Sequence, residues 1–152
     1  LGMKVKVLTR KPRTETLFLD FFDGQTVNFE ITSTTDQEEF FKDVDFLSIN
    51  TPKSDGYIID AAQFEMMKDG IFIVNTARGG VLNEVTLLQF IESGKIAGAA
   101  LDVFENEPTP ELPLLMNPNL SLSPHLGGNT VDAQEKIGAE LAAQIIDIKN
   151  KL

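Results

Sequence analysis

Cysteine is absent from this 152-residue chain, so the sequence contains neither a disulfide framework nor a thiolate nucleophile. Histidine occurs once, and any imidazole chemistry must therefore involve His125. Basic residues are also scarce, because 13 lysines and arginines stand against 23 acidic residues and the formal net charge is -10. This balance argues against nucleic acid or an anionic membrane as the main partner, since both are bound through basic surfaces.

Long apolar runs are missing as well. No run approaches the roughly 18 residues of a membrane span, and the first residues, LGMKVKVLTRKPR, lack the continuous apolar core of a signal peptide. Hydrophobic residues make up 42% and charged residues 24% of the chain, which is ordinary for a soluble globular domain with its own core. We therefore expect a soluble, cytoplasmic protein.

Short apolar runs alternate with helical patterns along the chain. The run IFIV, directly before Asn75, has no polar alternation and indicates a strand that is buried on both faces. Strands alternating with helices predict an α/β fold with a doubly wound parallel sheet. The expected strands cover residues 3–8, 27–31, 45–50, 71–74, 96–103 and 120–123.

Capping residues indicate where the helices begin. Capping boxes are expected at Thr35 with Glu38 and at Asp60 with Gln63. Residues 14–22 suggest a short helix before the Asp23-Gly24 turn signal, and residues 104–119 suggest an irregular loop that contains four prolines. The two remaining caps are expected at Asn83 and, before a final helix with an apolar stripe, at Asn129.

Four polar residues follow predicted strands, and the carboxyl ends of parallel strands meet at one edge of a sheet. Arg78 can offer a bidentate fork to a carboxylate, although a surface ion pair would also explain it. A carboxylate beside His125 would fix the imidazole tautomer and make a general acid/base pair. Glu105 and Glu107 both carry a carboxylate, and either could contact His125 in this way. The four residues are Thr51, Arg78, Asp102 and His125.

Each of these residues also has a structural explanation when it is taken alone. A single histidine after a proline is more often a loop residue than a catalyst, Asp102 could be a turn or cap residue, and Glu107 could be a surface acid. The functional interpretation therefore depends on the combination of these residues at successive strand ends. An arginine for a carboxylate, a histidine for a proton and a nucleotide-type sheet together suggest hydride transfer on a hydroxy or keto acid.

The segments VNTARGGVLNEVTLLQFIESGKIAGAALDVFENEP and LSPHLGGNTVDAQEKIG resemble the nucleotide-binding domain of the D-isomer-specific 2-hydroxyacid dehydrogenases. The resemblance runs from about Asp43 to the final helix and is strongest for the phosphoglycerate dehydrogenase branch, with glyoxylate and hydroxypyruvate reductases close behind. It implies that Arg78 binds the substrate carboxylate and carbonyl, and that Glu107 orients His125. It further implies that His125 is the acid/base that protonates the substrate carbonyl oxygen.

The resemblance also implies a cofactor site for NAD or NADP and no metal site. The aspartate of the family's LDVF motif contacts the nicotinamide carboxamide, and the resemblance assigns this role to Asp102. The other positions carried over are Thr76 and Ala77 beside the nicotinamide, Thr51 and Pro52 on the adenosine side, and Gly127 and Gly128, where backbone approaches the cofactor; Arg78 and His125 border the same site.

Two departures from the family pattern affect these expectations. The first is that the sequence contains no G-x-G-x-x-G loop and begins near the family's second strand, so residues 1–152 are expected to be a partial dinucleotide-binding domain without a substrate domain. The strand that would be missing is central, and residues 4–8 and 27–31 should then lose their link to the sheet. An exposed apolar edge and self-association are expected. Family members are commonly homodimers.

The second departure concerns the acid that binds the ribose in the family. Thr9 occupies its position, and Arg10, Lys11 and Arg13 follow. A basic loop here suits the 2′-phosphate of NADP, but it is equally consistent with a solvated loop on an acidic protein.

Three functions remain open from sequence. The first is an NAD(P)-dependent D-2-hydroxyacid dehydrogenase acting on a small 2-hydroxy or 2-keto acid. The second is a non-catalytic nucleotide-sensing or protein-interaction module, as in relatives that act as transcriptional corepressors. The third is an inactive fragment of the enzyme.

Overall fold

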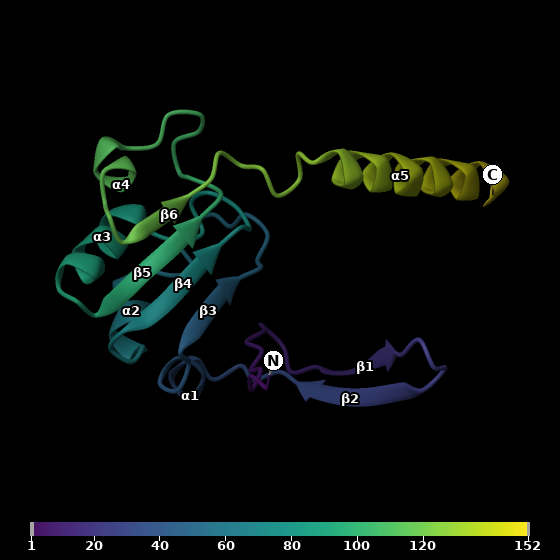
Figure 1. Ribbon diagram of the computed structural model, residues 1–152, viewed down its shortest axis with the longest axis horizontal. Coiled ribbons are helices and arrows are strands. Elements are labelled where there is room, and N and C mark those ends of the chain that lie inside the picture. The colour runs from purple at the N-terminus through teal and green to yellow at the C-terminus, as the bar shows by residue number, and fades with distance from the viewer. Residues whose placement is uncertain (1, 152) are drawn as a thin grey trace.

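Four parallel strands form the main sheet of the protein, in the order β3-β4-β5-β6 (Figure 1). A computed structural model of the chain describes residues 2–151. The expected α/β class and parallel sheet are confirmed. The strands are β3 (Phe46–Ile49), β4 (Ile71–Asn75), β5 (Ile96–Leu101) and β6 (Leu120–Leu122).

Helices connect these strands, and their caps explain where they begin. The predicted capping box is present, because Asp60 caps α2 (Ala61–Met66) and the Gln63 side chain accepts from the Asp60 backbone N–H at 3.1 Å. Asn83 caps α3 (Glu84–Glu92) as expected. The proline-rich loop contains a short helix that the sequence did not predict, α4 (Leu112–Leu115).

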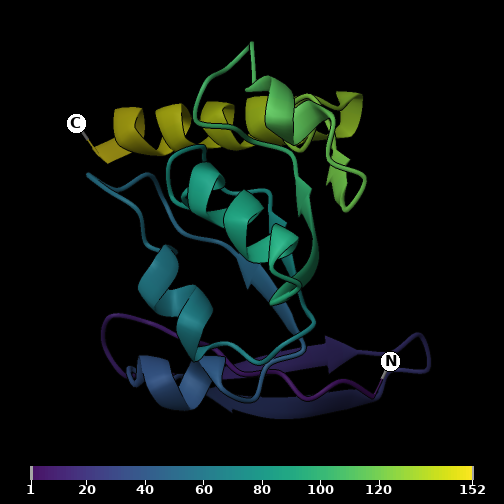
Figure 2. The same ribbon diagram turned by 90° about the vertical axis from the view of Figure 1, so that its left-hand side faces the viewer.

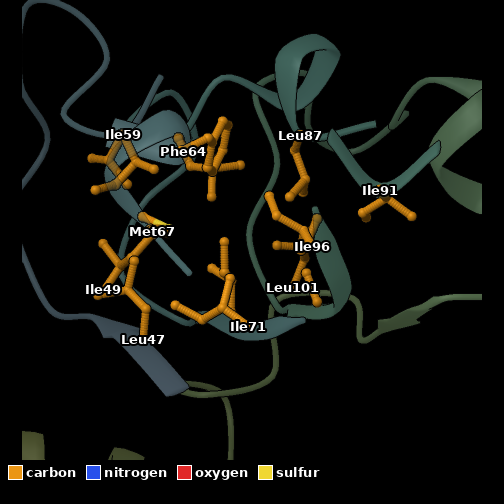
Figure 3. Packing of buried hydrophobic residues seen from close by; sticks show 14 of the residues in the cluster. Leu47, Ile49, Ile59, Phe64, Met67, Ile71, Leu87, Ile91, Ile96 and Leu101 are labelled. Carbon is orange, nitrogen blue, oxygen red and sulfur yellow. The ribbon is translucent and has the colours of Figure 1, made fainter. Parts of the chain in front are cut away.

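The hydrophobic core lies between one face of the sheet and helices α2 and α3 (Figures 2 and 3). Figure 3 shows Phe64 and Met67 of the α2 region facing the strands, with Leu87 and Ile91 of α3 beside them. Alternate residues of β3 and β4 are buried on this face. Burial of these side chains fixes the register of the strands, because a shift of one residue would turn them to the opposite face.

The opposite face of the sheet is open within residues 2–151. Phe46 and Phe72 stack there with ring centroids 5.6 Å apart, and they remain 65% and 46% exposed. Gly98 of β5 lies close to the residue before β6, since a Cβ there would come 2.7 Å from the carbonyl oxygen of Asn119.

The segment expected to be a short helix at residues 14–22 is a strand, and this prediction was wrong. β1 (Thr14–Asp20) pairs antiparallel with β2 (Thr26–Thr32) through a turn in which Gly24 has φ 82°. The backbone N–H and C=O groups of this segment bond to β2. Such pairing with a distant segment cannot be inferred from the local sequence pattern. The two strands form a separate sheet, as expected for residues 27–31 (Figure 1).

Residues 3–8 form no strand in the structure, in contrast to the prediction. Only Leu8 makes an isolated bridge, to Thr34. Around this bridge the Thr34 N–H donates to the Val7 carbonyl at 2.8 Å, and the Thr9 N–H donates to the Thr34 carbonyl at 3.0 Å.

Two expected caps are displaced by one residue. Asp36, not Thr35, caps α1 (Gln37–Phe41), where its carboxylate accepts from the Glu39 N–H at 3.0 Å. Thr130, not Asn129, accepts from the Ala133 N–H at 3.2 Å at the start of α5 (Val131–Lys151). Adjacent residues with similar side chains compete for the same N–H groups, so the local sequence does not decide between them.

Helix α5 extends away from the sheet (Figure 1). It has the predicted apolar stripe, but no residue of α5 is buried. Among the helices of residues 2–151, none combines the length and the apolar character needed to cross a membrane.

Candidate active site

The loop after β4 carries Arg78, and its shape is set by Asn75 at the end of the strand. The buried Asn75 side chain accepts from the Ala77 N–H at 3.1 Å and donates to the Arg78 carbonyl at 3.3 Å. The Arg78 guanidinium is exposed and donates to the Ala77 carbonyl at 2.6 Å. Within residues 2–151 it makes no hydrogen bond to Glu107 or His125, so its fork is available to an anion at the rim.

Glu107 and His125 lie in contact although 18 positions separate them. Glu107 Oε2 is 2.8 Å from His125 Nδ1, and the two side chains are 35% and 46% exposed. Glu107 Oε1 accepts from the Phe104 N–H at 2.9 Å. The contact predicted between an acid and the single histidine is present, and it involves Glu107 instead of Glu105.

The hydrogen bond from His125, followed by that from Phe104, lowers the pKa of the Glu107 carboxyl below its ordinary value. Glu107 is therefore ionised at neutral pH and can only accept. It follows that the shared proton is on His125 Nδ1, which leaves Nε2 available to exchange a proton with a ligand.

His125 also has an unusual backbone conformation. Its φ is 53°, in the left-handed region that residues with a side chain seldom adopt. The His125 N–H donates to the Ser123 carbonyl at 3.0 Å. Strained conformations of this kind persist where the surroundings hold them and are concentrated at functional sites.

The surroundings of His125 are held by Asp102, which is 5% exposed. Asp102 Oδ1 accepts from the Ser123 hydroxyl at 2.6 Å and from the Leu126 N–H at 2.8 Å, and Oδ2 accepts from the Gly127 N–H at 2.8 Å. Burial raises the pKa of Asp102, but these hydrogen bonds outweigh it and the net pKa is lowered. Asp102 thus fixes the loop on both sides of His125.

No pattern in the sequence indicated the partners of Asp102. Its expected contact with a nicotinamide carboxamide stays a prediction. Ser123 was missed, and its position directly after β6 was the only available signal. A Cβ at Gly127 would lie 3.1 Å from Asp102 Oδ2, which is closer than an ordinary van der Waals contact.

An open pocket of about 440 Å³ borders the acid/base pair. Its walls are mainly apolar, with the two ionisable groups at one side, which is the usual composition of a small-molecule site. It is lined by Phe104, Glu107, Pro108, Pro110, Leu115, Leu122, Ser123, Pro124 and His125.

Several expected cofactor residues are arranged so that they could hold a dinucleotide. Thr51 Oγ1 is buried and has no hydrogen-bond partner among residues 2–151, so a ligand could supply one. Pro52 and Thr76 are exposed and Ala77 is half-buried. A Cβ at Gly128 would meet nothing within 4 Å. These residues fit a nicotinamide dinucleotide. The glycine-rich loop that binds its pyrophosphate is absent from the sequence.

Hydrogen bonds to Ser33 hold the basic loop of residues 9–13 in place. Thr9 Oγ1 lies 2.6 Å from Ser33 Oγ, and the Arg13 N–H donates to the same hydroxyl at 2.8 Å. Ser33 is buried, whereas Arg10 and Lys11 are exposed. The loop, held by these hydrogen bonds, therefore presents the two exposed side chains to solvent.

A parallel α/β sheet with Arg78 after one strand and the Glu107–His125 contact after others is typical of the dinucleotide-binding domains of dehydrogenases. The chain belongs to the D-isomer specific 2-hydroxyacid dehydrogenase, NAD binding domain family, whose model matches residues 1–127. The cofactor of this family of domains is a nicotinamide dinucleotide, NAD or NADP.

Individual relatives support this assignment. The chain is 44% identical over 115 residues to a hydroxypyruvate reductase of Thermotoga maritima, covering 72% of this chain and 38% of the relative. It is 40% identical to human D-3-phosphoglycerate dehydrogenase, with 73% and 21% covered. It therefore spans well under half of these relatives.

A solved structure gives the same fold. An NADPH-dependent glyoxylate/hydroxypyruvate reductase of Sinorhizobium meliloti, in complex with NADP and malonate, aligns with a TM-score of 0.70 at 29% identity, covering 86% of this chain and 37% of that one.

Proposed function

We propose that the protein takes part in reversible hydride transfer between NAD(P) and a small D-2-hydroxy or 2-keto acid of the glyoxylate, hydroxypyruvate or phosphoglycerate type. The observation that carries the proposal is the 2.8 Å contact between Glu107 and His125 at the carboxyl rim. A nicotinamide supplies the hydride exchange when it is bound.

The residues of this chain would divide the remaining work. Arg78 would bind the substrate carboxylate through its fork and polarise the carbonyl. His125 Nε2 would give a proton to the carbonyl oxygen in reduction and take the hydroxyl proton in oxidation. Glu107 would keep the imidazole in the correct tautomer and stabilise its charged form.

The cofactor residues are proposed on the same basis. Thr76 and Ala77 would line the nicotinamide, Thr51 and Pro52 the adenosine side, and Gly128 leaves room for close approach. Asp102 after β5 and His125 with Gly127 after β6 would border the nicotinamide, and Thr9 with Arg10 the ribose. The exposed side chains of Arg10 and Lys11 would suit the 2′-phosphate of NADP.

A fluorescence titration of the chain with NADPH and NADH tests the cofactor site. We expect NADPH to bind more tightly, and Arg10→Ala to weaken NADPH by about tenfold or more, since a hydrogen bond to a charged group contributes roughly 1.5–3 kcal/mol. NADH binding should change little. Lys136→Ala on α5 is the matched control and should leave both affinities unchanged; an equal loss for both cofactors in Arg10→Ala would contradict the 2′-phosphate assignment.

Turnover of hydroxypyruvate tests the reaction. His125→Ala should abolish turnover while NADPH binding is kept, because the imidazole is the proton donor. Cofactor binding without any turnover by the unaltered chain would contradict the catalytic role and favour the nucleotide-sensing alternative. A homodimer is proposed as the working form by analogy with the family.

A further inference from the structure

Glu84 and Glu105 bind each other's backbone at the rim of the sheet, although neither belongs to the acid/base pair. Glu84 Oε1 accepts from the Glu105 N–H at 2.7 Å, and Glu105 Oε1 accepts from the Glu84 N–H at 3.0 Å. Glu84 is the first residue of α3, and Glu105 lies in the loop after β5. The exchange therefore ties the start of a helix to the loop that carries Glu107.

Tyr57 adds a third segment to this connection. Its hydroxyl donates to Glu105 Oε2 at 2.9 Å, and this hydrogen bond is the main reason that the pKa of Tyr57 is raised. Tyr57 lies between β3 and α2, a few residues after Thr51 and Pro52. Both oxygens of Glu105 are thus used, one by each neighbouring segment.

The connection reaches Glu107 through Phe104. The Phe104 carbonyl lies so close over Gly79 that a Cβ on Gly79 would be 1.8 Å from its oxygen. The Phe104 N–H donates to Glu107 Oε1 at 2.9 Å, and Glu107 Oε2 contacts His125. The Phe104 N–H belongs to the preceding peptide group, so the hydrogen bonds of the Phe104 and Glu105 N–H groups are linked through residue Phe104. A displacement of Phe104 would therefore act on the carboxylate that contacts the imidazole.

Glu84 is an unfavourable residue to bury for packing alone. It is 6% exposed, and burial with the like charges of Glu105, Glu107 and Glu111 opposes its ionised form. The N–H of Glu105 offsets part of this cost. A positioning role for the hydrogen bond from the Glu105 N–H would explain why a carboxyl is buried at Glu84.

We propose that Tyr57, Glu105 and Glu84 form a positioning clamp that keeps Glu107 within hydrogen-bonding distance of His125, so that the imidazole retains its proton on Nδ1. These three are positioning residues, which act on the imidazole through Phe104 and Glu107. The inference rests on the proposed function only for the catalytic meaning of that proton.

The single histidine allows a direct test by ¹H–¹⁵N NMR of the imidazole above its titration range. The unaltered chain should show the Nδ1–H form. Glu84→Ala and Tyr57→Phe should each lose most of this signal in favour of Nε2–H. Glu84→Gln keeps an acceptor for the Glu105 N–H and should retain it, as should Glu92→Ala, a control at the exposed end of α3.

The outcomes separate the clamp from the proposed function. A folded Glu84→Ala with an unchanged imidazole spectrum overturns the clamp. If circular dichroism shows that Glu84→Ala does not fold, Tyr57→Phe decides, since Tyr57 is 45% exposed and an unchanged spectrum there overturns the clamp equally. The readout needs neither cofactor nor substrate, so absent turnover with the expected NMR pattern contradicts the function alone.

Discussion

Gly79 is a residue at which a neighbouring backbone, and not an unusual φ, excludes every other side chain. The oxygen that a Cβ would meet at 1.8 Å belongs to the Phe104–Glu105 peptide, whose N–H donates to Glu84, so this peptide cannot rotate away without breaking that hydrogen bond. At the level of single residues, the site thus depends on one missing methyl group as much as on its ionisable side chains.

Gly79→Ala should destabilise the fold by roughly 3 kcal/mol through forced displacement of this peptide. Gly128→Ala is the matched control, because a Cβ there meets nothing within 4 Å, and it should change stability by no more than about 0.5 kcal/mol. Urea unfolding of both variants measures the difference. Equal stabilities would show that the loop moves freely.

Glu84 should make the stability of the protein depend on pH. Burial raises its pKa from 4.5 to about 7, so the folded state holds the proton at pH values where the unfolded chain has lost it. Below pH 4.5 the carboxyl is neutral in both states and costs nothing. Between pH 4.5 and about 7 stability falls at up to about 1.36 kcal/mol per pH unit, by about 3 kcal/mol in all, and the loss is complete once pH has passed the folded-state pKa and the buried charge is present.

Glu84→Gln should remove this slope, because the amide stays neutral while it still accepts from the Glu105 N–H. Thermal unfolding between pH 5 and 8 is the measurement, and Glu92→Gln, an exposed acid on the same helix, is the control. A Glu84→Gln variant that keeps the slope of the unaltered chain would assign the dependence to another group.

Elements with strong local signals could be predicted from the sequence. Asp60 with Gln63 and Asn83 mark helix starts, and IFIV marks a strand, because these patterns depend on neighbours only a few residues away. Residues 14–20 could not be assigned locally, since their strand exists through pairing with residues 26–32. The same limit explains the missing strand at residues 3–8.

The site divides in the same way. Position after a strand indicated Arg78 and His125, but chemistry could not separate Glu105 from Glu107; only the resemblance chose correctly for the contact with His125. Glu84 gave no signal, because acids are common in the first turn of a helix. Tyr57 meets Glu105 across 48 positions, a distance over which no pattern in the chain is informative.

At the scale of the whole molecule, apolar surface remains open in several places. The hairpin has one apolar face, formed by Leu17, Leu19, Val27 and Phe29, each 40–52% exposed, and Phe18 lies on its opposite face at 64%. The open face of the sheet and the stripe of α5 add further apolar area. Surfaces of this kind associate in water.

We therefore expect the chain to self-associate, with a mass in sedimentation that rises with concentration. Phe29→Ser on the apolar face of the hairpin should weaken the association. Phe18→Ser removes the same side chain from the polar face and should leave it unchanged. A monodisperse monomer at all concentrations would contradict the expectation.

The left-handed backbone of His125 sets folding against chemistry at one position. A side chain held at φ 53° costs on the order of 1 kcal/mol, and glycine would adopt this conformation without that cost. A mutational search for greater stability would therefore favour His125→Gly, whereas a search for turnover would reject it. Any effort to make this domain more robust has to exempt its only histidine.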